Sequence, residues 1–370
     1  MINETTYTKE WILKKSSQYV RGKKKADPTL IEKVTKALHL LEALALTDLK
    51  FIFKGGTSLL LLLNKMHRFS IDIDIIIEEK KQDIDLREVL SKIIEGSKVF
   101  IRFEENIRQG NSEVPKAHYK VFFKSALDDK ESYILLDVLF EKSHYVKVIE
   151  RNISCSLIEY SDPAVKVAMP SVDCILGDKL TAFAPNTTGI PFGMNKELEI
   201  IKQLFDVGNL FDEMEDIEAV RSTFRKMAEQ ELAYRNKSKD LTFVDVLHDI
   251  FETSKILSER GRIEKETFHQ LQTGVSRIKD YIFSESYILE SAVNSASKAA
   301  YLALLLKYDN TEVERFDHKI DLREFVIEHP DFKKFKTIMK LDPEAYFYWY
   351  KSIELLSIEE ARASIKLVHN

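Results

Sequence analysis

The residue types most suited to chemistry lie in residues 54–77. A short apolar segment ends at Gly55 and Gly56, and Thr57 and Ser58 follow directly. Glycine adopts backbone angles that other residues avoid and lets a ligand approach the main chain closely. A threonine or serine can cap a helix whose free N–H groups suit a phosphate. The sequence therefore predicts a strand, a glycine turn and a short helix capped by Thr57 or Ser58, together forming a phosphate-binding element.

Two aspartates follow in an alternating segment. Asp72 and Asp74 alternate with isoleucines over residues 71–77, so both carboxylates share one face of a predicted strand. Neighbouring carboxylates repel each other, whereas Mg²⁺ binds one or two carboxylates together with substrate phosphates and water. A lone Asp-x-Asp would favour a strand end facing solvent. The glycine turn upstream instead favours a nucleoside triphosphate site that uses Mg²⁺.

A third aspartate lies inside an apolar segment. Asp137 is surrounded by six apolar residues in residues 134–140. A buried carboxylate is costly unless it is paired or bound to a metal. We expect Asp137 to complete the site of Asp72 and Asp74, and the alternative is an edge strand that turns Asp137 toward water.

Two of these motifs resemble a family signature. Gly55-Gly56-Thr57-Ser58 and Arg68-Phe69-Ser70-x-Asp72-x-Asp74 are similar to the signature of the AbiEii/AbiGii toxin-like nucleotidyltransferases. These enzymes belong to the DNA polymerase β-like nucleotidyltransferase superfamily and include toxins of type IV toxin–antitoxin systems. The resemblance is specific over residues 54–77 and looser as far as about residue 211. It implies an α/β (α+β) fold, with a mixed-sheet nucleotidyltransferase core followed by a C-terminal helical bundle.

The resemblance also implies roles for residues outside the signature. The family takes a third carboxylate from a strand like that of Asp137, and its characteristic helix carries a lysine that contacts nucleotide phosphate, here Lys179. The alternative for Lys179 is an ordinary exposed helix lysine. Asp206 matches a further family position, although Gln203 stands where the family usually has an acid. The expected metal ligands are Asp72, Asp74 and Asp137; the nucleotide-binding residues are Gly55, Gly56, Thr57, Ser58, Arg68 and Lys179; the catalytic residues are Asp72, Asp74, Lys179 and Asp206.

Apolar periodicity predicts the elements that position these residues. Strands are expected over residues 51–53, 71–77, 99–107, 118–123 and 133–140. Helices are expected over residues 30–46, 86–94, 170–183, 196–211, 217–234, 243–258, 265–283, 287–308 and 343–356. We expect a nucleotidyltransferase core domain over residues 1–165 and a helical domain over residues 166–370. The aromatic cluster at residues 346–350, which follows several lysines, could stack on RNA bases, but buried helix packing is the commoner explanation and ranks first.

Composition narrows the functional classes. The chain has 370 residues, 44% hydrophobic and 31% charged, and a net charge of −5. This charge argues against non-specific coating of nucleic acid, which needs a strongly basic domain, but allows a local RNA groove. Cys155 and Cys174 are widely spaced and form no metal or redox motif. With a polar N-terminus and no apolar run long enough for a bilayer, the expected location is the cytoplasm, with no membrane partner.

The expected function is a Mg²⁺-dependent nucleotidyltransferase toxin. It transfers a nucleoside monophosphate from a triphosphate to an acceptor hydroxyl, with the 3′ end of tRNA as the first candidate and an antitoxin protein as a partner. A protein or a small molecule such as an aminoglycoside is the alternative acceptor. A binding module that has kept the fold but lost turnover is the alternative of a different class.

Overall fold

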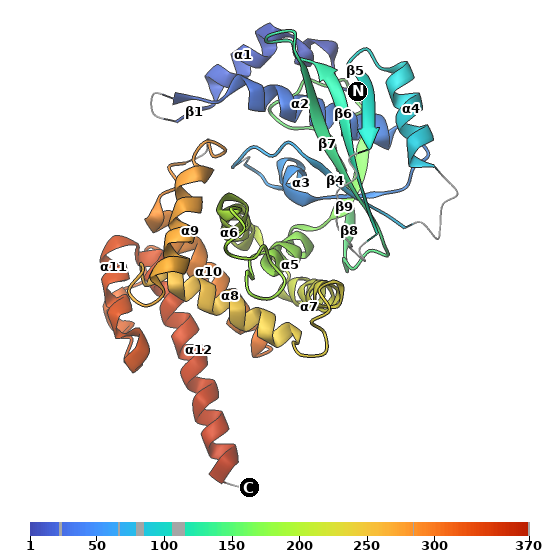
Figure 1. The fold of residues 1–370 in the computed structure, drawn as a ribbon. Helices are drawn as coiled ribbons and strands as arrows, with labels where there is room; N and C mark the ends of the chain where they lie inside the picture. The colour runs from blue at the N-terminus through green and yellow to red at the C-terminus, as the bar shows by residue number, and fades with distance from the viewer. Residues whose placement is uncertain (22–23, 66, 79–84, 106–114, 284, 369–370) are drawn as a thin grey trace. The chain divides into compact units, whose positions relative to one another are not determined.

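The chain folds into two compact units. The computed structural model describes residues 1–21, 24–65, 67–78, 85–105, 115–283 and 285–368 and is drawn in Figure 1. The sheet unit holds Met1–Ile175 together with Asp280–Ser286, and the helical unit holds Leu176–Lys279 together with Tyr287–Asn370. The domain boundary expected after residue 165 stays a prediction.

A five-stranded mixed sheet forms the sheet unit, in the order β3-β4-β7-β6-β5. The strands are β3 (Ile52–Lys54), β4 (Ile73–Ile77), β7 (Glu131–Phe140), β6 (Lys116–Lys124) and β5 (Phe100–Glu105). β4 and β7 are parallel, and the other neighbouring pairs are antiparallel. Each strand overlaps a segment in which the sequence predicts a strand, and the predicted α/β fold class is confirmed.

The two faces of this sheet differ in burial. Ile73 and Ile75 of β4 pair in register with Leu136 and Val138 of β7, and all four side chains are buried. The helix α2 (Pro28–Ala45) covers this face, because the ammonium of its Lys36 lies 5.7 Å from the ring centroid of Phe123 on β6. The intervening residues of β4, β7 and β6 lie on the opposite face, which is only partly covered.

The remaining elements of the sheet unit are short. They are the helices η1 (Glu4–Tyr7), α1 (Lys9–Gln18), α3 (Gly55–Leu62) and α4 (Leu86–Gly96), and the strand pairs β1 (Val20–Arg21) with β2 (Lys24–Lys25) and β8 (Val148–Asn152) with β9 (Lys166–Pro170). The sequence predicts neither strand pair. β1 and β2 have two residues each, too few for a period-2 pattern, and β8 is exposed at four of its five residues, so it has no buried face to give an apolar alternation.

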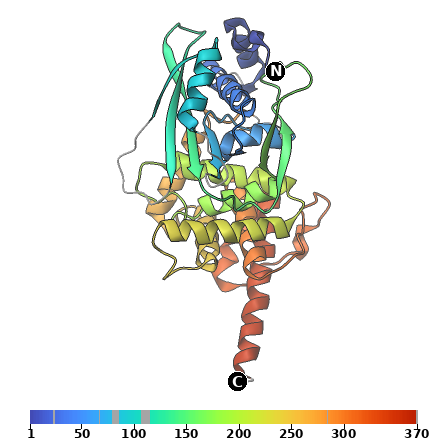
Figure 2. The same cartoon turned by 90° about the vertical axis from the view of Figure 1, so that its right-hand side faces the viewer.

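The helical unit begins within α5 (Val172–Ala182). Its other helices are α6 (Glu197–Glu213), α7 (Ile217–Tyr234), α8 (Phe243–Ser258), α9 (Lys265–Ile278), α10 (Leu289–Lys307), η3 (Leu322–Glu324), η4 (Pro330–Thr337), α11 (Ile338–Leu341) and α12 (Pro343–Val368). The bounds of α7 and α8 are those the sequence predicts. In Figures 1 and 2 the end of α12 extends beyond the other helices of its unit.

One predicted helix is too long. The sequence predicts a helix over residues 265–283, but α9 ends at Ile278 and Asp280–Ser286 belongs to the sheet unit. There the Tyr281 carbonyl accepts a hydrogen bond from Phe69 N at 2.9 Å. This pairing is between residues far apart in sequence, so local periodicity does not reveal it.

The aromatic cluster of the helical unit is packed inside it. Tyr346, Phe347, Tyr348 and Trp349 are each at most 2% exposed, and the Trp349 indole donates a hydrogen bond to Ser258 Oγ at 3.1 Å. Buried helix packing, which ranked first, is confirmed. These four rings are therefore not available to stack on a base.

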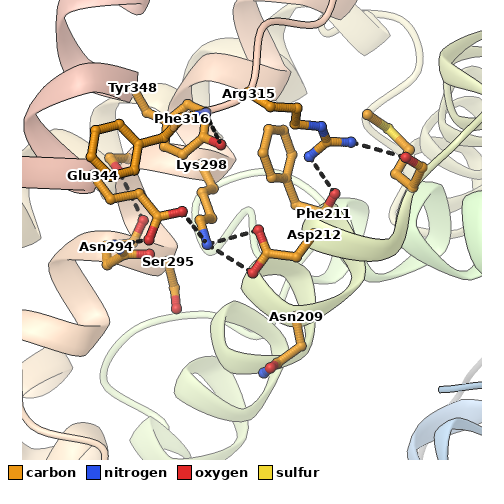
Figure 3. A network of polar contacts seen from close by, with 12 residues as sticks. Asn209, Phe211, Asp212, Asn294, Ser295, Lys298, Arg315, Phe316, Glu344 and Tyr348 are labelled. Carbon is orange, nitrogen blue, oxygen red and sulfur yellow. Dashed lines mark hydrogen bonds and ion pairs between the residues drawn. The ribbon is translucent and has the colours of Figure 1, made fainter. Parts of the chain in front are cut away.

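A buried lysine ties three helices of this unit together (Figure 3). Lys298 of α10 lies 2.8 Å from Asp212 of α6 and 3.1 Å from Glu344 of α12. Burial disfavours the ammonium, but Asp212 and Glu344 outweigh burial and raise the pKa of Lys298. The lysine therefore stays charged and holds α6, which also carries Asp206, against α10 and α12.

None of the helices in the described residues combines the length and the apolar character that a membrane-crossing segment requires.

Burial of His39 in α2 predicts acid sensitivity of the fold. Burial and the nearby Lys36 lower the pKa of His39 to about 4. The Glu42 carboxylate, whose Oε2 lies 3.9 Å from His39 Nδ1, does not reverse this lowering of the pKa. The unfolded chain takes up a proton here near the ordinary pKa of about 6.5, so the free energy of unfolding should fall by up to roughly 2–3 kcal/mol as the pH drops from 6.5 to 4. Urea unfolding of wild type and His39→Gln across this range measures the effect.

The matched control for this prediction is His269→Gln, because His269 is exposed on α9. His39→Gln should flatten the pH dependence of unfolding, whereas His269→Gln should leave it unchanged. An equal slope in wild type and His39→Gln would contradict the assignment.

Candidate functional site

The glycine turn lies directly against the aspartate strand. Gly55 follows β3 and has a φ of +79°, a conformation that side chains other than glycine rarely adopt. A Cβ atom at Gly55 would lie 2.0 Å from Asp74 Oδ2. Only glycine therefore lets the main chain pass this close to the Asp74 carboxylate.

The second glycine meets the rest of the signature. A Cβ atom at Gly56 would lie 2.7 Å from Ser70 Oγ and 2.8 Å from Arg68 Nη2. The structure thus brings together the two sequence motifs, which are separated by α3. Arg68 is 7% exposed, and its Nη1 donates to the Phe69 carbonyl at 3.1 Å.

Thr57 and Ser58 do not cap the helix as expected. α3 begins at Gly55, and its N-cap is Lys54, which provides no side-chain cap. Thr57 Oγ1 donates to the Asp72 carbonyl at 2.6 Å, and Ser58 Oγ donates to the Gly55 carbonyl at 2.7 Å. Both side chains are fully buried. These hydrogen bonds hold the turn in place, and neither hydroxyl is exposed to a ligand. A phosphate at this turn would therefore contact the main-chain N–H groups of α3.

A polar row crosses the partly covered face of the sheet. Lys54 of β3 pairs with Asp74 of β4, Asp74 pairs with Asp137 of β7, and Asp137 pairs with His118 of β6. In-register side chains on neighbouring strands share a face and lie close together. Asp137 Oδ1 lies 2.7 Å from His118 Nδ1, with 29% and 14% of the two side chains exposed. Asp137 therefore lies in the middle of the sheet and not on an edge strand.

The oxygen donors at this row suit a magnesium ion. Mg²⁺ is held in nucleotide sites by one or two carboxylates plus phosphates and water, and Asp74 and Asp137 are adjacent in register. Within the described residues, no group of three or more His, Cys, Asp or Glu side chains is arranged to hold a metal ion. A closed site is therefore not shown, and Asp72, Asp74 and Asp137 as ligands stay a prediction.

The segment Asp280–Ser286 supports the signature. Arg68 forms a β-bridge with Ile282, and the rings of Phe69 and Phe283 lie 4.4 Å apart between centroids. Phe283 also contacts Tyr19 at 4.8 Å. This apolar contact fixes the chain just before Ser70 and Asp72.

Lys179 and Asp206 form a buried ion pair within the helical unit. Lys179 Nζ of α5 lies 3.0 Å from Asp206 Oδ2 of α6, with 10% and 1% of the side chains exposed. Gln203 Oε1 accepts a further hydrogen bond from Lys179 at 3.1 Å. Lys179 is thus not an ordinary exposed lysine. The neighbouring Lys202 pairs instead with Glu199 at 2.9 Å.

Sequence reasoning missed Lys54 and His118. Lys54 directly precedes the glycines, and His118 opens a predicted strand, so both lay inside segments already singled out. The missing information was the register between strands, which places Lys54 beside Asp74 and His118 beside Asp137.

Gly55→Ala should destabilise the sheet unit. The added Cβ meets Asp74 Oδ2 and takes a strained φ, which costs about 1–3 kcal/mol before Asp74 moves. Gly96→Ala, at the end of α4, meets nothing within 4 Å and is the control. Chemical denaturation of both variants measures the difference, and equal stability of Gly55→Ala and wild type would contradict this close contact.

Comparison with known proteins assigns the chain to a family. Residues 39–335 match the family described as "Nucleotidyl transferase AbiEii toxin, Type IV TA system". The crystal structure of JHP933 from Helicobacter pylori is similar at 14% identity and a TM-score of 0.43, over 77% of this chain and 94% of that chain. An antigenic nucleotidyltransferase-like protein from Paracoccidioides brasiliensis has 14% identity and a TM-score of 0.35, over 59% and 97%. The comparison with curated proteins gave no match. The family match covers most of the sequence, and the chain belongs to the AbiEii nucleotidyltransferase toxins of type IV toxin–antitoxin systems.

Proposed function

We propose that this nucleotidyltransferase uses Mg²⁺ to transfer a nucleoside monophosphate from a triphosphate to the 3′ end of tRNA in the cytoplasm. The observation that carries the proposal is the pairing of Asp74 with Asp137 beside the Gly55 turn. Carboxylates next to a helix N-terminus are suited to a triphosphate and its metal ion. Membership of the family implies a triphosphate substrate and an antitoxin partner.

Each residue of the site has a role in this proposal. Asp72, Asp74 and Asp137 would hold Mg²⁺, and the bound ion would supply positive charge that stabilises the transferring phosphoryl group. The main chain at Gly55 and Gly56 would bind the triphosphate, and the buried Thr57, Ser58 and Arg68 would keep that turn in shape.

The helical unit supplies a further charged pair. Lys179 would neutralise phosphate charge, and Asp206 would orient Lys179 through their 3.0 Å contact.

The acceptor hydroxyl attacks the α-phosphorus and gives its proton to solvent water, and the bond from that phosphorus to the bridging oxygen breaks. The nucleoside monophosphate is then joined to the acceptor, and pyrophosphate leaves.

Basic side chains on β6 bear on the identity of the acceptor. Lys116 and Lys120 of β6 lie on the same partly covered face as His118, whereas Tyr119 lies on the other face. Two positive charges on this face favour a polyanionic acceptor. A protein hydroxyl or a small molecule such as an aminoglycoside is the alternative acceptor. A module without turnover is set aside, because the family is one of nucleotidyltransferases.

Removal of either signature aspartate should abolish transfer while the fold remains. Asp72→Asn or Asp74→Asn loses metal-bound charge worth several kcal/mol in the transition state, which is a loss of at least about 100-fold in rate. The measurement is incorporation of labelled nucleotide into total RNA with excess Mg²⁺. Asp129→Asn is the matched control, because Asp129 is exposed and has a φ of +62° that asparagine tolerates.

Expression in bacteria tests the acceptor. Sequencing of tRNA 3′ ends should find added nucleotides in cultures expressing wild type or Asp129→Asn, and none with Asp72→Asn. Growth arrest with unmodified tRNA 3′ ends would reject tRNA as the acceptor and favour a protein or another RNA.

Lys179→Ala should weaken triphosphate binding, because a positive charge on phosphate is lost. The same change leaves Asp206 buried and unpaired with Lys179, which destabilises the helical unit by about 3–5 kcal/mol. The double variant Lys179→Ala/Asp206→Asn relieves this cost and separates binding from folding. Calorimetry should show weak nucleotide binding by the double variant and normal binding by Lys202→Ala. Normal nucleotide binding by a folded double variant would show that Lys179 does not bind the triphosphate.

A further inference from the structure

We propose that His118 is a positioning residue for nucleotidyl transfer, holding the Asp137 carboxylate in its working orientation. This inference rests on the proposed role of Asp137 as a metal ligand. His118 belongs to neither signature motif, and the roles proposed above do not use it. It becomes visible only when β6 and β7 are placed side by side.

The contact is short and its two residues are fixed by the sheet. His118 and Asp137 are in-register partners in the antiparallel pair β6–β7, and Nδ1 of the histidine lies 2.7 Å from Oδ1 of the aspartate. Only 14% of the His118 side chain is exposed. The backbone on both sides is held by the strand ladder, so the imidazole has little freedom to leave the carboxylate.

The direction of the hydrogen bond follows from the chemistry of the pair. An ionised carboxylate only accepts hydrogen bonds, so Nδ1 of His118 donates to Oδ1 of Asp137. Asp137 has the carboxylate of Asp74 as its in-register neighbour on the other side, and like charges at this spacing repel. A donor on the β6 side therefore offsets part of the negative charge on Asp137 and holds its Oδ1 in one place, so that the carboxylate keeps a single orientation beside Asp74.

Packing alone does not explain a histidine at this position. The neighbouring Tyr119 and Val121 are buried, and Tyr119 points to the face that α2 covers, whereas His118 lies on the partly covered face with Asp137. An apolar side chain would fill the same space without donating to the carboxylate. Residues that orient metal-binding side chains in this way typically contribute a factor of about 10–100 in metal affinity or activity.

Three substitutions separate hydrogen bonding from packing. His118→Asn places an amide donor near the position of Nδ1, His118→Gln places it near the position of Nε2, and His118→Leu keeps the bulk without a donor. Lys124→Leu is the control, because Lys124 lies on the same face of β6 but is exposed and pairs in register with Glu131. Each full-length variant is titrated with Mn²⁺ and followed by electron paramagnetic resonance, and kcat and KM for the triphosphate are measured in parallel.

His118→Leu and His118→Gln should each weaken Mn²⁺ binding and lower kcat by on the order of 10–100-fold. His118→Asn should stay within a few-fold of wild type, and Lys124→Leu should bind Mn²⁺ as wild type does. In an Asp137→Asn background, His118→Leu should cause no further loss, because a residue that acts through Asp137 has nothing left to position. If His118→Leu does not fold, the difference in Mn²⁺ affinity and kcat between His118→Asn and His118→Gln tests whether the donor at Nδ1 is needed.

Two results would overturn different claims. Wild-type Mn²⁺ affinity and kcat in His118→Gln, with Asp137→Asn impaired in both, would reject the role of His118 and leave the proposed function intact. Wild-type behaviour of Asp137→Asn itself would reject the proposed ligand set, and with it this inference.

Discussion

The close approach of the Gly55 main chain to the Asp74 carboxylate is the constraint on which the sheet unit depends. It requires a positive φ and the absence of a Cβ atom at one residue. Because of it, β3 can run beside β4, α3 can begin immediately, and Gly56 can reach Arg68 and Ser70. The buried hydroxyls of Thr57 and Ser58 then fasten the turn to Asp72 and to Gly55 itself. The geometry of the turn and the position of β4 therefore depend on each other.

The sequence predicts the parts of this arrangement that are local. The alternation of isoleucine and aspartate predicts the strand that carries Asp74, although β4 begins at Ile73, just after Asp72, and two adjacent glycines predict the turn at Gly55. Helical periodicity gives the ends of α7 and α8, where the apolar stripe and the capping residues Asp216 and Thr242 agree. These features depend on residues within one or two turns of each other, so a single sequence contains the information.

The parts that the sequence does not predict depend on pairing across long separations. The register of β7 against β4 and β6 decides that Asp137 lies between Asp74 and His118, and no local pattern contains it. Thr57 was expected to cap a helix, but α3 already begins at Gly55, so Thr57 lies inside it and donates to the Asp72 carbonyl just before β4. The end of α9 was misplaced for the same reason, since Tyr281 and Ile282 pair with the signature.

The return of Asp280–Ser286 to the sheet unit has a consequence during protein synthesis. Arg68 and Phe69 belong to the first part of the sheet unit, which ends at Ile175. Their partners Ile282 and Tyr281 are added about a hundred residues after Ile175. At typical elongation rates of about 5–20 residues per second, this delay is on the order of 10 s. A chain that stops before residue 280 lacks the strand partner and the Phe283 ring that hold the segment leading to Ser70 and Asp72. An interrupted toxin message therefore yields an unsupported signature motif, and the nascent chain completes this support only after about half of the helical unit has been made.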